Sequence, residues 1–385
     1  MKTVLIAVSG SIAFYKSYEL ISLFKKEGFK VKILLSSSVL KFASRLSFEA
    51  LADDVLCDEN ENWHSDKNHI KFTRDCDLLV FAPATISSIN KLAQGIADNL
   101  FIQTLIASKA PLIIAPAANT VMLNHFSTQN SLKILKENGA VIIPAVSKEL
   151  ACKEVGEGAL ADVLDIFYIS KRMLLRDEFF CDKTVLITGG GTKEKIDDVR
   201  CISNFSSGKM AKALADVFYF LGAKVVFLSS IDFQTPYELK KYGSSLELKE
   251  LMDKYKNADF LFMLAAVSDF LPQKFDGKIK KNLYKNGFNL ELKLNKDLLV
   301  DYKFKGKKIA FKMETDEANA LENAKKSFVE KKLDMLCLNV LSKKNPCFDS
   351  DFNELVLLLK DDFISLGYDS KINLAFKVAQ ECKKL

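Results

Sequence analysis

Two groups of small and hydroxyl-bearing residues stand directly after short apolar runs, which is where α/β proteins place phosphate-binding turns. Ser9-Gly10-Ser11 follows Val4–Val8, and Pro83-Ala84-Thr85 with Ser88 follows Leu78–Ala82. Small residues at such a turn leave backbone N–H groups at a helix N-terminus free to bind a phosphate. The hydroxyls could add further contacts. Taken alone, each turn fits an ordinary capped helix start at least as well.

Three further side chains have types suited to acid–base or carboxylate chemistry. Asn119 follows the apolar run Leu112–Ala115 and could hold a carboxylate, although asparagine is also an ordinary turn residue. His69 stands alone, and a lone histidine is more often structural. Cys152 lies beside Lys153, whose positive charge would suit the thiol to proton donation, but a bystander thiol explains it too.

The elements that must position these residues form two similar halves. Lys2-Thr3-Val4-Leu5-Ile6 recurs as Lys183-Thr184-Val185-Leu186-Ile187, and each copy leads into a turn of small residues. This shared strand–turn–helix context favours two separate nucleotide-binding-type domains. Strands that alternate with helices predict mainly parallel sheets covered on both faces. The predicted fold class is therefore α/β, with two Rossmann-like three-layer α/β/α domains.

Periodicity and punctuating residues place the individual elements. Strands are predicted at Val4–Val8, Val31–Leu35, Leu78–Ala82, Leu112–Ala115, Val141–Ile143, Val185–Thr188, Lys224–Leu228, Phe260–Ala265, Lys308–Phe311 and Met335–Asn339. Helices are predicted at Ala13–Glu27, Lys209–Leu221 and Glu317–Lys331. The Lys- and Asn-rich stretch Asp276–Leu294 is interpreted as a flap or β-hairpin, and the helical, charged segment Ile166–Lys183 as the linker between the halves.

Composition narrows the classes of function. The chain has 385 residues, 49 % of them hydrophobic, and a net charge of +6, which is too mild to indicate nucleic acid but leaves anionic small molecules open. No apolar run approaches the ~20 residues that span a bilayer, so no membrane partner is expected. The N-terminus is better explained as a strand than as a signal peptide. Eight cysteines without CxxC spacing indicate free thiols in a reducing, cytoplasmic setting.

The order of these motifs resembles a known enzyme family. In the first half, Val8-Ser9-Gly10-Ser11-Ile12-Ala13, His69, Ala82-Pro83-Ala84-Thr85, Ala115-Pro116-Ala117-Ala118-Asn119 and Ala151-Cys152 follow the pattern of flavin-containing cysteine decarboxylases. The second half, with Asp197-Asp198-Val199-Arg200, Ser203-Asn204-Phe205-Ser206-Ser207-Gly208-Lys209-Met210 and Lys278-Ile279-Lys280-Lys281, is similar to phosphopantothenate–cysteine ligases. The whole chain resembles the bifunctional phosphopantothenoylcysteine decarboxylase/phosphopantothenate–cysteine ligase family of coenzyme A synthesis.

For the first half, the resemblance implies an FMN-dependent decarboxylation of phosphopantothenoylcysteine to 4′-phosphopantetheine. It implies catalytic roles for His69, for Asn119 at the substrate carboxylate and for Cys152 as proton donor in the final reduction. The residues implied to bind FMN are Ser9, Gly10, Ser11, Ser36, Pro83, Thr85 and Ser88. The loop of Cys152 departs from the family, because Lys153-Glu154 follows the cysteine and the arginine usual at its end is missing.

For the second half, the resemblance implies ligation of cysteine to 4′-phosphopantothenate through an acyl-cytidylate, with CTP as co-substrate and Mg²⁺. Lys278 matches the catalytic lysine, although without the family its basic run would be interpreted as a solvated surface. Arg200 and Asn204 match positions that handle the activated acid, and Asn204 is also expected to be catalytic. The residues implied to contact CTP are Asp269, Lys278, Lys296, Asp297, Leu298, Leu299, Phe311 and Lys331; Lys296 replaces a proline of the family.

The predicted domains are residues 1–178 for the decarboxylase and 182–385 for the ligase. The resemblance also implies a homo-oligomer with trimeric decarboxylase contacts and dimeric ligase contacts. Two alternatives stay open: a two-domain nicotinamide oxidoreductase, which the lack of GxGxxG spacing disfavours, and a non-catalytic binding module, for which the altered Cys152 loop gives some ground.

Overall fold

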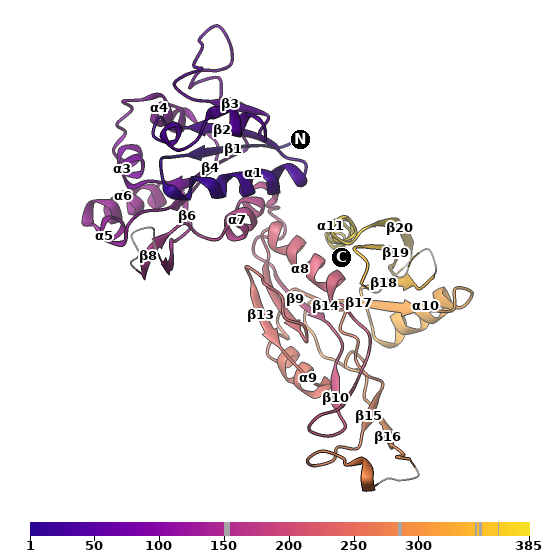
Figure 1. Cartoon of the computed structure of the whole chain (residues 1–385). Coiled ribbons are helices and arrows are strands. Elements are labelled where there is room, and N and C mark those ends of the chain that lie inside the picture. The colour runs from indigo at the N-terminus through magenta and orange to yellow at the C-terminus, as the bar shows by residue number, and fades with distance from the viewer. Residues whose placement is uncertain (150–154, 284–286, 343–344, 346–348, 361) are drawn as a thin grey trace. The chain divides into compact units, whose positions relative to one another are not determined.

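The computed structural model describes residues 1–385 except 150–154, 284–286, 343–344, 346–348 and 361. The chain divides into two compact units, Met1–Leu175 and Arg176–Leu385 (Figure 1). Both contain a central, mainly parallel sheet with flanking helices, so the predicted α/β class is confirmed. Among the described residues, no helix is long and apolar enough to cross a membrane.

The first unit is built on a parallel sheet of six strands in the order β3-β2-β1-β4-β5-β6. Its elements in chain order are β1 (Thr3–Val8), η1 (Ile12–Tyr15), α1 (Lys16–Lys26), β2 (Lys30–Leu35), η2 (Val39–Lys41), α2 (Arg45–Glu49), β3 (Asp54–Leu56), β4 (Leu78–Ala84), α3 (Ile86–Gln94), α4 (Leu100–Ala107), β5 (Leu112–Pro116), α5 (Thr120–Asn124), α6 (Phe126–Glu137), β6 (Val141–Ile142), β7 (Val146–Glu149), β8 (Val155–Ala159) and α7 (Val163–Leu175). Strands β7 and β8 form a separate antiparallel pair.

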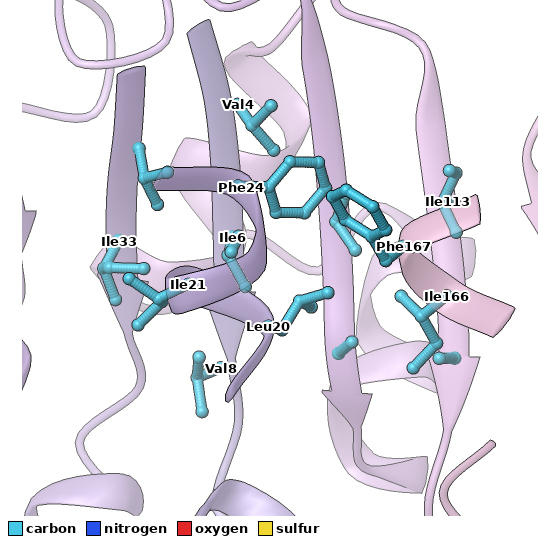
Figure 2. Packing of buried hydrophobic residues seen from close by; sticks show 14 of the residues in the cluster. Val4, Ile6, Val8, Leu20, Ile21, Phe24, Ile33, Ile113, Ile166 and Phe167 are labelled. Atoms are coloured by element: carbon cyan, nitrogen blue, oxygen red, sulfur yellow. The ribbon is translucent and has the colours of Figure 1, made fainter. Parts of the chain in front are cut away.

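Helix α7 belongs to the core of this unit. Ile166 and Phe167 pack with Phe24 of α1 against the sheet strands, as Figure 2 shows, and Leu174 is buried in the same cluster. The prediction that the linker begins at Ile166 was therefore wrong, because the apolar residues of the segment repeat at helical spacing and face the sheet. Most charged positions of the segment follow the helix, between Arg176 and Lys183, and within the helix Lys171 is buried and pairs with Glu27.

The second unit has an eight-stranded sheet in the order β13-β12-β9-β14-β17-β18-β19-β20, parallel except at β19 and β20. Its elements are β9 (Thr184–Gly189), β10 (Lys193–Lys195), β11 (Cys201–Ser203), α8 (Lys209–Phe220), β12 (Lys224–Ser229), β13 (Glu238–Lys241), α9 (Ser245–Asp253), β14 (Phe260–Met263), β15 (Phe270–Pro272), η3 (Lys281–Leu283), β16 (Leu292–Leu294), β17 (Lys307–Glu314), α10 (Ala320–Glu330), β18 (Met335–Val340), β19 (Phe352–Leu358), β20 (Phe363–Ser370) and α11 (Lys371–Cys382). Helices α8 and α11 pack in one cluster, and α9 and α10 in the other.

The repeated pentapeptide occupies equivalent places in the two sheets. Its copies form β1 and β9, each bordered by parallel strands on both sides. At the start of each copy an aspartate carboxylate accepts the backbone N–H of the threonine: Asp77 from Thr3 at 2.7 Å and Asp259 from Thr184 at 2.8 Å. The sequence echo therefore reflects two sheets that are fixed in the same way at their amino ends.

Some helices and strands begin or end at other residues than predicted, because turns interrupt them. A 3₁₀ turn precedes α1, so the first α-helix begins at Lys16 and not at Ala13. The predicted strand Phe260–Ala265 ends at Met263. In the stretch Asp276–Leu294, predicted as a flap or β-hairpin, β16 pairs antiparallel with β15, so its partner strand lies before the predicted bounds.

Candidate active sites

In the first unit, Ser9 joins the ends of two neighbouring strands. Its buried hydroxyl donates to the carbonyl of Pro83 at 2.8 Å and accepts the N–H of Thr85 at 2.8 Å. Thr85 in turn contacts Ser88, with 3.3 Å between the hydroxyl oxygens. The turns after β1 and β4 are thus brought together at the carboxyl edge of the sheet, where α/β proteins bind ligands. The Ser9 hydroxyl itself is used in holding them there.

The turn at Gly10 and the buried side chain of Ser36 together form a candidate ligand-binding cradle at this edge of the sheet. A Cβ on Gly10 would lie 2.3 Å from Cβ of Ser38, so the chain has room only for glycine. The Ser11 hydroxyl caps η1 by accepting the N–H of Ala13. Ser36, at the end of β2, is 8 % exposed, and its hydroxyl has no hydrogen-bond partner among the described residues. An orphaned buried hydroxyl beside a glycine turn fits the phosphate of a flavin nucleotide.

Asn119 lies at the same edge, after β5. The N–H of Ala117 donates to the carbonyl of Ala84 at 2.9 Å, which ties this segment to β4. The Asn119 side-chain oxygen accepts the N–H of Val121 at 2.9 Å and caps α5. The structure therefore brings together Asn119 and the predicted FMN-binding residues of β1 and β4. Cys152, the predicted proton donor, lies outside the described residues.

His69 is held by contacts within its own loop. Its Nδ1 lies 3.5 Å from a carboxylate oxygen of Glu61, and its ring meets Trp63 edge-on at 5.2 Å between centroids. Both partners belong to its own loop, which is fastened to β3 by an ion pair of 3.2 Å between Lys67 and Asp54. No hydrogen bond within the described ranges joins this loop to the turns that carry Ser9, Thr85 or Asn119.

In the second unit, Thr188 performs a similar joining role. Its hydroxyl accepts the N–H groups of Leu264 and Ala265, both at 3.1 Å, and so links the ends of β9 and β14. The glycine turn that follows β9 is held by the Tyr242 hydroxyl, which donates to the carbonyl of Gly189 at 2.8 Å. The segment after β14 then lines two adjoining hollows.

The first hollow gathers the predicted nucleotide contacts. It has a volume of about 340 Å³ and is lined by Asp269, Lys296, Asp297, Leu298, Leu299, Phe311 and Lys331, together with residues after β14. Asp297 pairs with Lys331 at 2.7 Å and accepts the N–H of Leu299 at 2.7 Å. Burial alone would raise the pKa of Asp297, but these hydrogen bonds outweigh it and lower the pKa. Seven of the eight predicted CTP contacts thus surround one hollow, and Lys278 is the exception.

The second hollow, of about 220 Å³, shares Phe311 with the first and reaches the N-terminus of α8 at Ser206–Lys209. Lys209 donates to the carbonyl of Asp349 at 2.7 Å and to the carboxylate of Asp351 at 3.0 Å. Asn353, 3 % exposed, also lines it, and its side-chain oxygen has no partner in the described part of the chain. Sequence reasoning missed Asn353, since the antiparallel strand β19 that carries it was not predicted.

Of the two residues expected to handle the activated acid, Asn204 adjoins the hollows, since it precedes Phe205 and bonds to Val267, which line them. The Asn204 amide donates to the carbonyl of Val267 at 3.0 Å. Arg200 donates to the carbonyl of Ile279 at 2.6 Å and pairs with Asp197 at 2.7 Å. Lys278 is exposed. Within the described ranges, no group of three or more His, Cys, Asp or Glu side chains is arranged to hold a metal ion.

The two α/β units each match a family of flavoproteins. Residues 1–174 match the flavoprotein family, and residues 180–385 match the DNA/pantothenate metabolism flavoprotein C-terminal domain. The chain belongs to the family of bifunctional coenzyme A biosynthesis proteins named CoaBC.

The relatives cover both units. The CoaBC protein of Bacillus subtilis is 34 % identical over 398 residues, covering 100 % of this chain and 97 % of the relative. Among solved structures, a PPC decarboxylase mutant complexed with pantothenoylaminoethenethiol is 34 % identical and covers 44 % of this chain and 95 % of its own, with a TM-score of 0.40. The structure of the C-terminal domain of a CoaBC protein is 30 % identical in sequence. The match covers 52 % of this chain and 94 % of that domain, with a TM-score of 0.43.

Proposed function

We propose that the two units catalyse consecutive steps of coenzyme A biosynthesis. The second unit joins cysteine to 4′-phosphopantothenate, and the first unit decarboxylates the product to 4′-phosphopantetheine. The observation that carries this proposal is the full-length match to a bifunctional relative, in which both units are covered. The two candidate sites described above lie in separate units, which is consistent with two separate reactions.

The first unit would hold FMN at the carboxyl edge of its sheet. Ser36, Thr85 and the backbone N–H of Gly10 would bind the phosphate, because an unpartnered hydroxyl and a glycine turn stand there together. Bound FMN would supply the oxidation of the cysteinyl carbon–sulfur unit that makes loss of carbon dioxide feasible, and in its reduced form the electrons that return the product to the thiol. Asn119 has its side-chain oxygen committed to Val121, which orients its amide nitrogen as the donor to the substrate carboxylate.

His69 would reach that site from another copy of the chain. Its loop is fastened to β3, and its contacts among the described residues are to Glu61 and Trp63 of the same loop. A homo-oligomer in which one copy presents this loop to the Asn119 turn of the next would complete the site. Cys152 remains the proposed proton donor of the final reduction.

The second unit would use CTP to activate the acid. The cytidine would occupy the hollow lined by Phe311 and Asp297, and the triphosphate would extend toward the N-terminus of α8, whose dipole favours anions. The substrate carboxylate attacks the α-phosphate and releases pyrophosphate, and the cysteine amine then displaces CMP. Lys278 would stabilise the charge that develops at the phosphates. Mg²⁺ would enter bound to the triphosphate.

An end-point assay tests both steps at once. The purified chain, reconstituted with FMN, is incubated with 4′-phosphopantothenate, cysteine, CTP and Mg²⁺. Stoichiometric pyrophosphate, CMP and carbon dioxide are expected, whereas omission of CTP should prevent all three. ATP in place of CTP tests the nucleotide preference. Pyrophosphate and CMP without carbon dioxide would refute the decarboxylase half. Absence of pyrophosphate, with carbon dioxide still released from added phosphopantothenoylcysteine, would refute the ligase half.

A further inference from the structure

The segment that carries Lys278 is attached to the second unit by one buried carboxylate. Asp197 is 0 % exposed. Its Oδ1 accepts the backbone N–H groups of Val199 at 2.8 Å and Arg200 at 2.7 Å, both in its own turn. Its Oδ2 faces the other way and accepts the N–H of Ile279 at 3.0 Å and Nε of Arg200 at 3.0 Å. One oxygen therefore builds the local turn, and the other bridges to the lysine segment.

Backbone hydrogen bonds before Lys278 and a side-chain hydrogen bond after it continue the same attachment. The N–H of Asp198 donates to the carbonyl of Gly277 at 3.3 Å, and the N–H of Phe275 donates to the carbonyl of Ile196 at 2.8 Å. Nη2 of Arg200 donates to the carbonyl of Ile279 at 2.6 Å. The residues on either side of Lys278 are thus fixed, while its own side chain is exposed.

The charge on Asp197 suits this task. Burial alone would raise its pKa, but the hydrogen bonds from Ile279, Val199 and Arg200 outweigh burial and hold the pKa well below its ordinary value. The carboxylate is therefore ionised throughout the neutral range. It also offsets part of the positive charge that Arg200, Lys278 and Lys280 bring into the same short region.

We infer that Asp197 is a positioning residue for the ligase reaction: through Ile279 and Arg200 it holds the backbone of Lys278 where the lysine can reach the phosphates. This inference rests on the proposed role of Lys278. Stabilisation of developing charge needs a donor held to within about 0.5 Å. A lysine on an unattached loop would lose that placement, although the chain could still bind the nucleotide.

The geometry offers an isosteric test. In Asp197→Asn only one side-chain oxygen remains, and the new NH₂ group must face N–H donors either in the local turn (Val199, Arg200) or at the bridge (Ile279, Arg200). In both orientations one of the two sets of hydrogen bonds that link the turn to the Lys278 segment is lost. Asp198→Asn is the matched control, because it removes the same charge from the exposed neighbouring residue and leaves the backbone bond to Gly277 in place.

Two measurements decide the outcome. We expect Asp197→Asn to lower kcat for pyrophosphate release about 10- to 100-fold, equivalent to about 1.4–2.8 kcal/mol, with KM for CTP changed less than about 3-fold. Hydrogen exchange at the Ile279 amide should accelerate at least about 10-fold in this variant. Asp198→Asn should leave both quantities at their wild-type values. Carbon dioxide release from added phosphopantothenoylcysteine should be unaffected by either substitution.

Several results would overturn the inference. Wild-type kcat together with unchanged exchange at Ile279 would show that the bridge is dispensable. A fall in kcat matched by a similar weakening of CTP binding would assign Asp197 to the nucleotide hollow instead. If Asp197→Asn unfolds the unit, Arg200→Lys, which keeps the charge but loses the bond to the Ile279 carbonyl, must show the same faster exchange. A wild-type chain that releases no pyrophosphate refutes the ligase proposal, whereas exchange at Ile279 still tests the attachment.

Discussion

Two serines at the carboxyl edge of the first sheet are expected to respond to truncation in opposite ways. The Ser9 hydroxyl bridges Pro83 and Thr85 inside the protein, whereas the Ser36 hydroxyl is buried with no partner in the described ranges. In Ser9→Ala the Thr85 N–H loses its acceptor, which costs about 1–3 kcal/mol of unfolding free energy. In Ser36→Ala an unsatisfied group disappears, so the FMN-free protein should be equally stable or more stable.

The effect on FMN affinity should have the opposite order: Ser36→Ala should weaken FMN binding more than Ser9→Ala does. A hydrogen bond to a charged phosphate contributes about 1.5–3 kcal/mol, so Ser36→Ala should weaken FMN binding on the order of 10- to 100-fold. Thermal unfolding of the FMN-free protein and titration of flavin fluorescence measure the two quantities separately. A Ser36→Ala protein that is less stable without FMN, yet binds FMN as tightly as wild type, would show that Ser36 is only structural and that the cradle is elsewhere.

Three further predictions concern other parts of the chain. Lys278→Gln should abolish pyrophosphate release from CTP, and release at the normal rate would show that another cation stabilises the charge. Phe167→Ala should lower the stability of the first unit by about 3–5 kcal/mol, against a much smaller loss for Leu164→Ala on the same helix, because Phe167 is 6 % and Leu164 37 % exposed; urea unfolding measures both. Because the pKa of Asp297 is lowered in the folded state, its pair with Lys331 should stabilise the second unit at neutral pH and lose that effect below about pH 4. Unfolding of wild type and Asp297→Asn at pH 7 and pH 3 tests this, and an equal difference at both values would contradict it.

The parallel strands could be predicted from sequence because each is a short run of apolar residues that ends in a proline or a turn of small residues. The strands predicted around Val4, Leu78 and Leu112 all form, and β4 and β5 continue through Pro83 and Pro116. β19 and β20 were missed because their inward residues alternate with exposed ones, and both strands are partly solvated. A sequence in which apolar and polar residues alternate in this way looks like a polar surface segment. Only the pairing with a neighbouring strand shows that one of its faces is buried.

For the sites, the order of the motifs predicted which residues take part, but not which residues they are hydrogen-bonded to. Nothing in the residues around Ser9 indicates that its hydroxyl is consumed by Pro83 and Thr85, because the two turns are far apart in sequence and meet only when β1 and β4 pair. Arg200 was predicted as a substrate contact, whereas its bond to the carbonyl of Ile279 depends on a fold that brings two distant loops together. Long-range hydrogen bonds of this kind leave no local pattern in a sequence.

The amino ends of the two sheets are held by the same kind of contact, whereas the contacts at their carboxyl ends differ. At the amino ends, Asp77 and Asp259 hold the repeated strands in the same way. At the carboxyl ends, a hydroxyl joins neighbouring strands in both units. Ser9 does so from the turn after its strand, and Thr188 from within the strand. The joining hydroxyl therefore sits closer to the ligand side in the first unit than in the second. Truncation of Thr188 should accordingly lower stability with little direct effect on nucleotide affinity, whereas truncation of Ser9 should disturb the flavin turn as well.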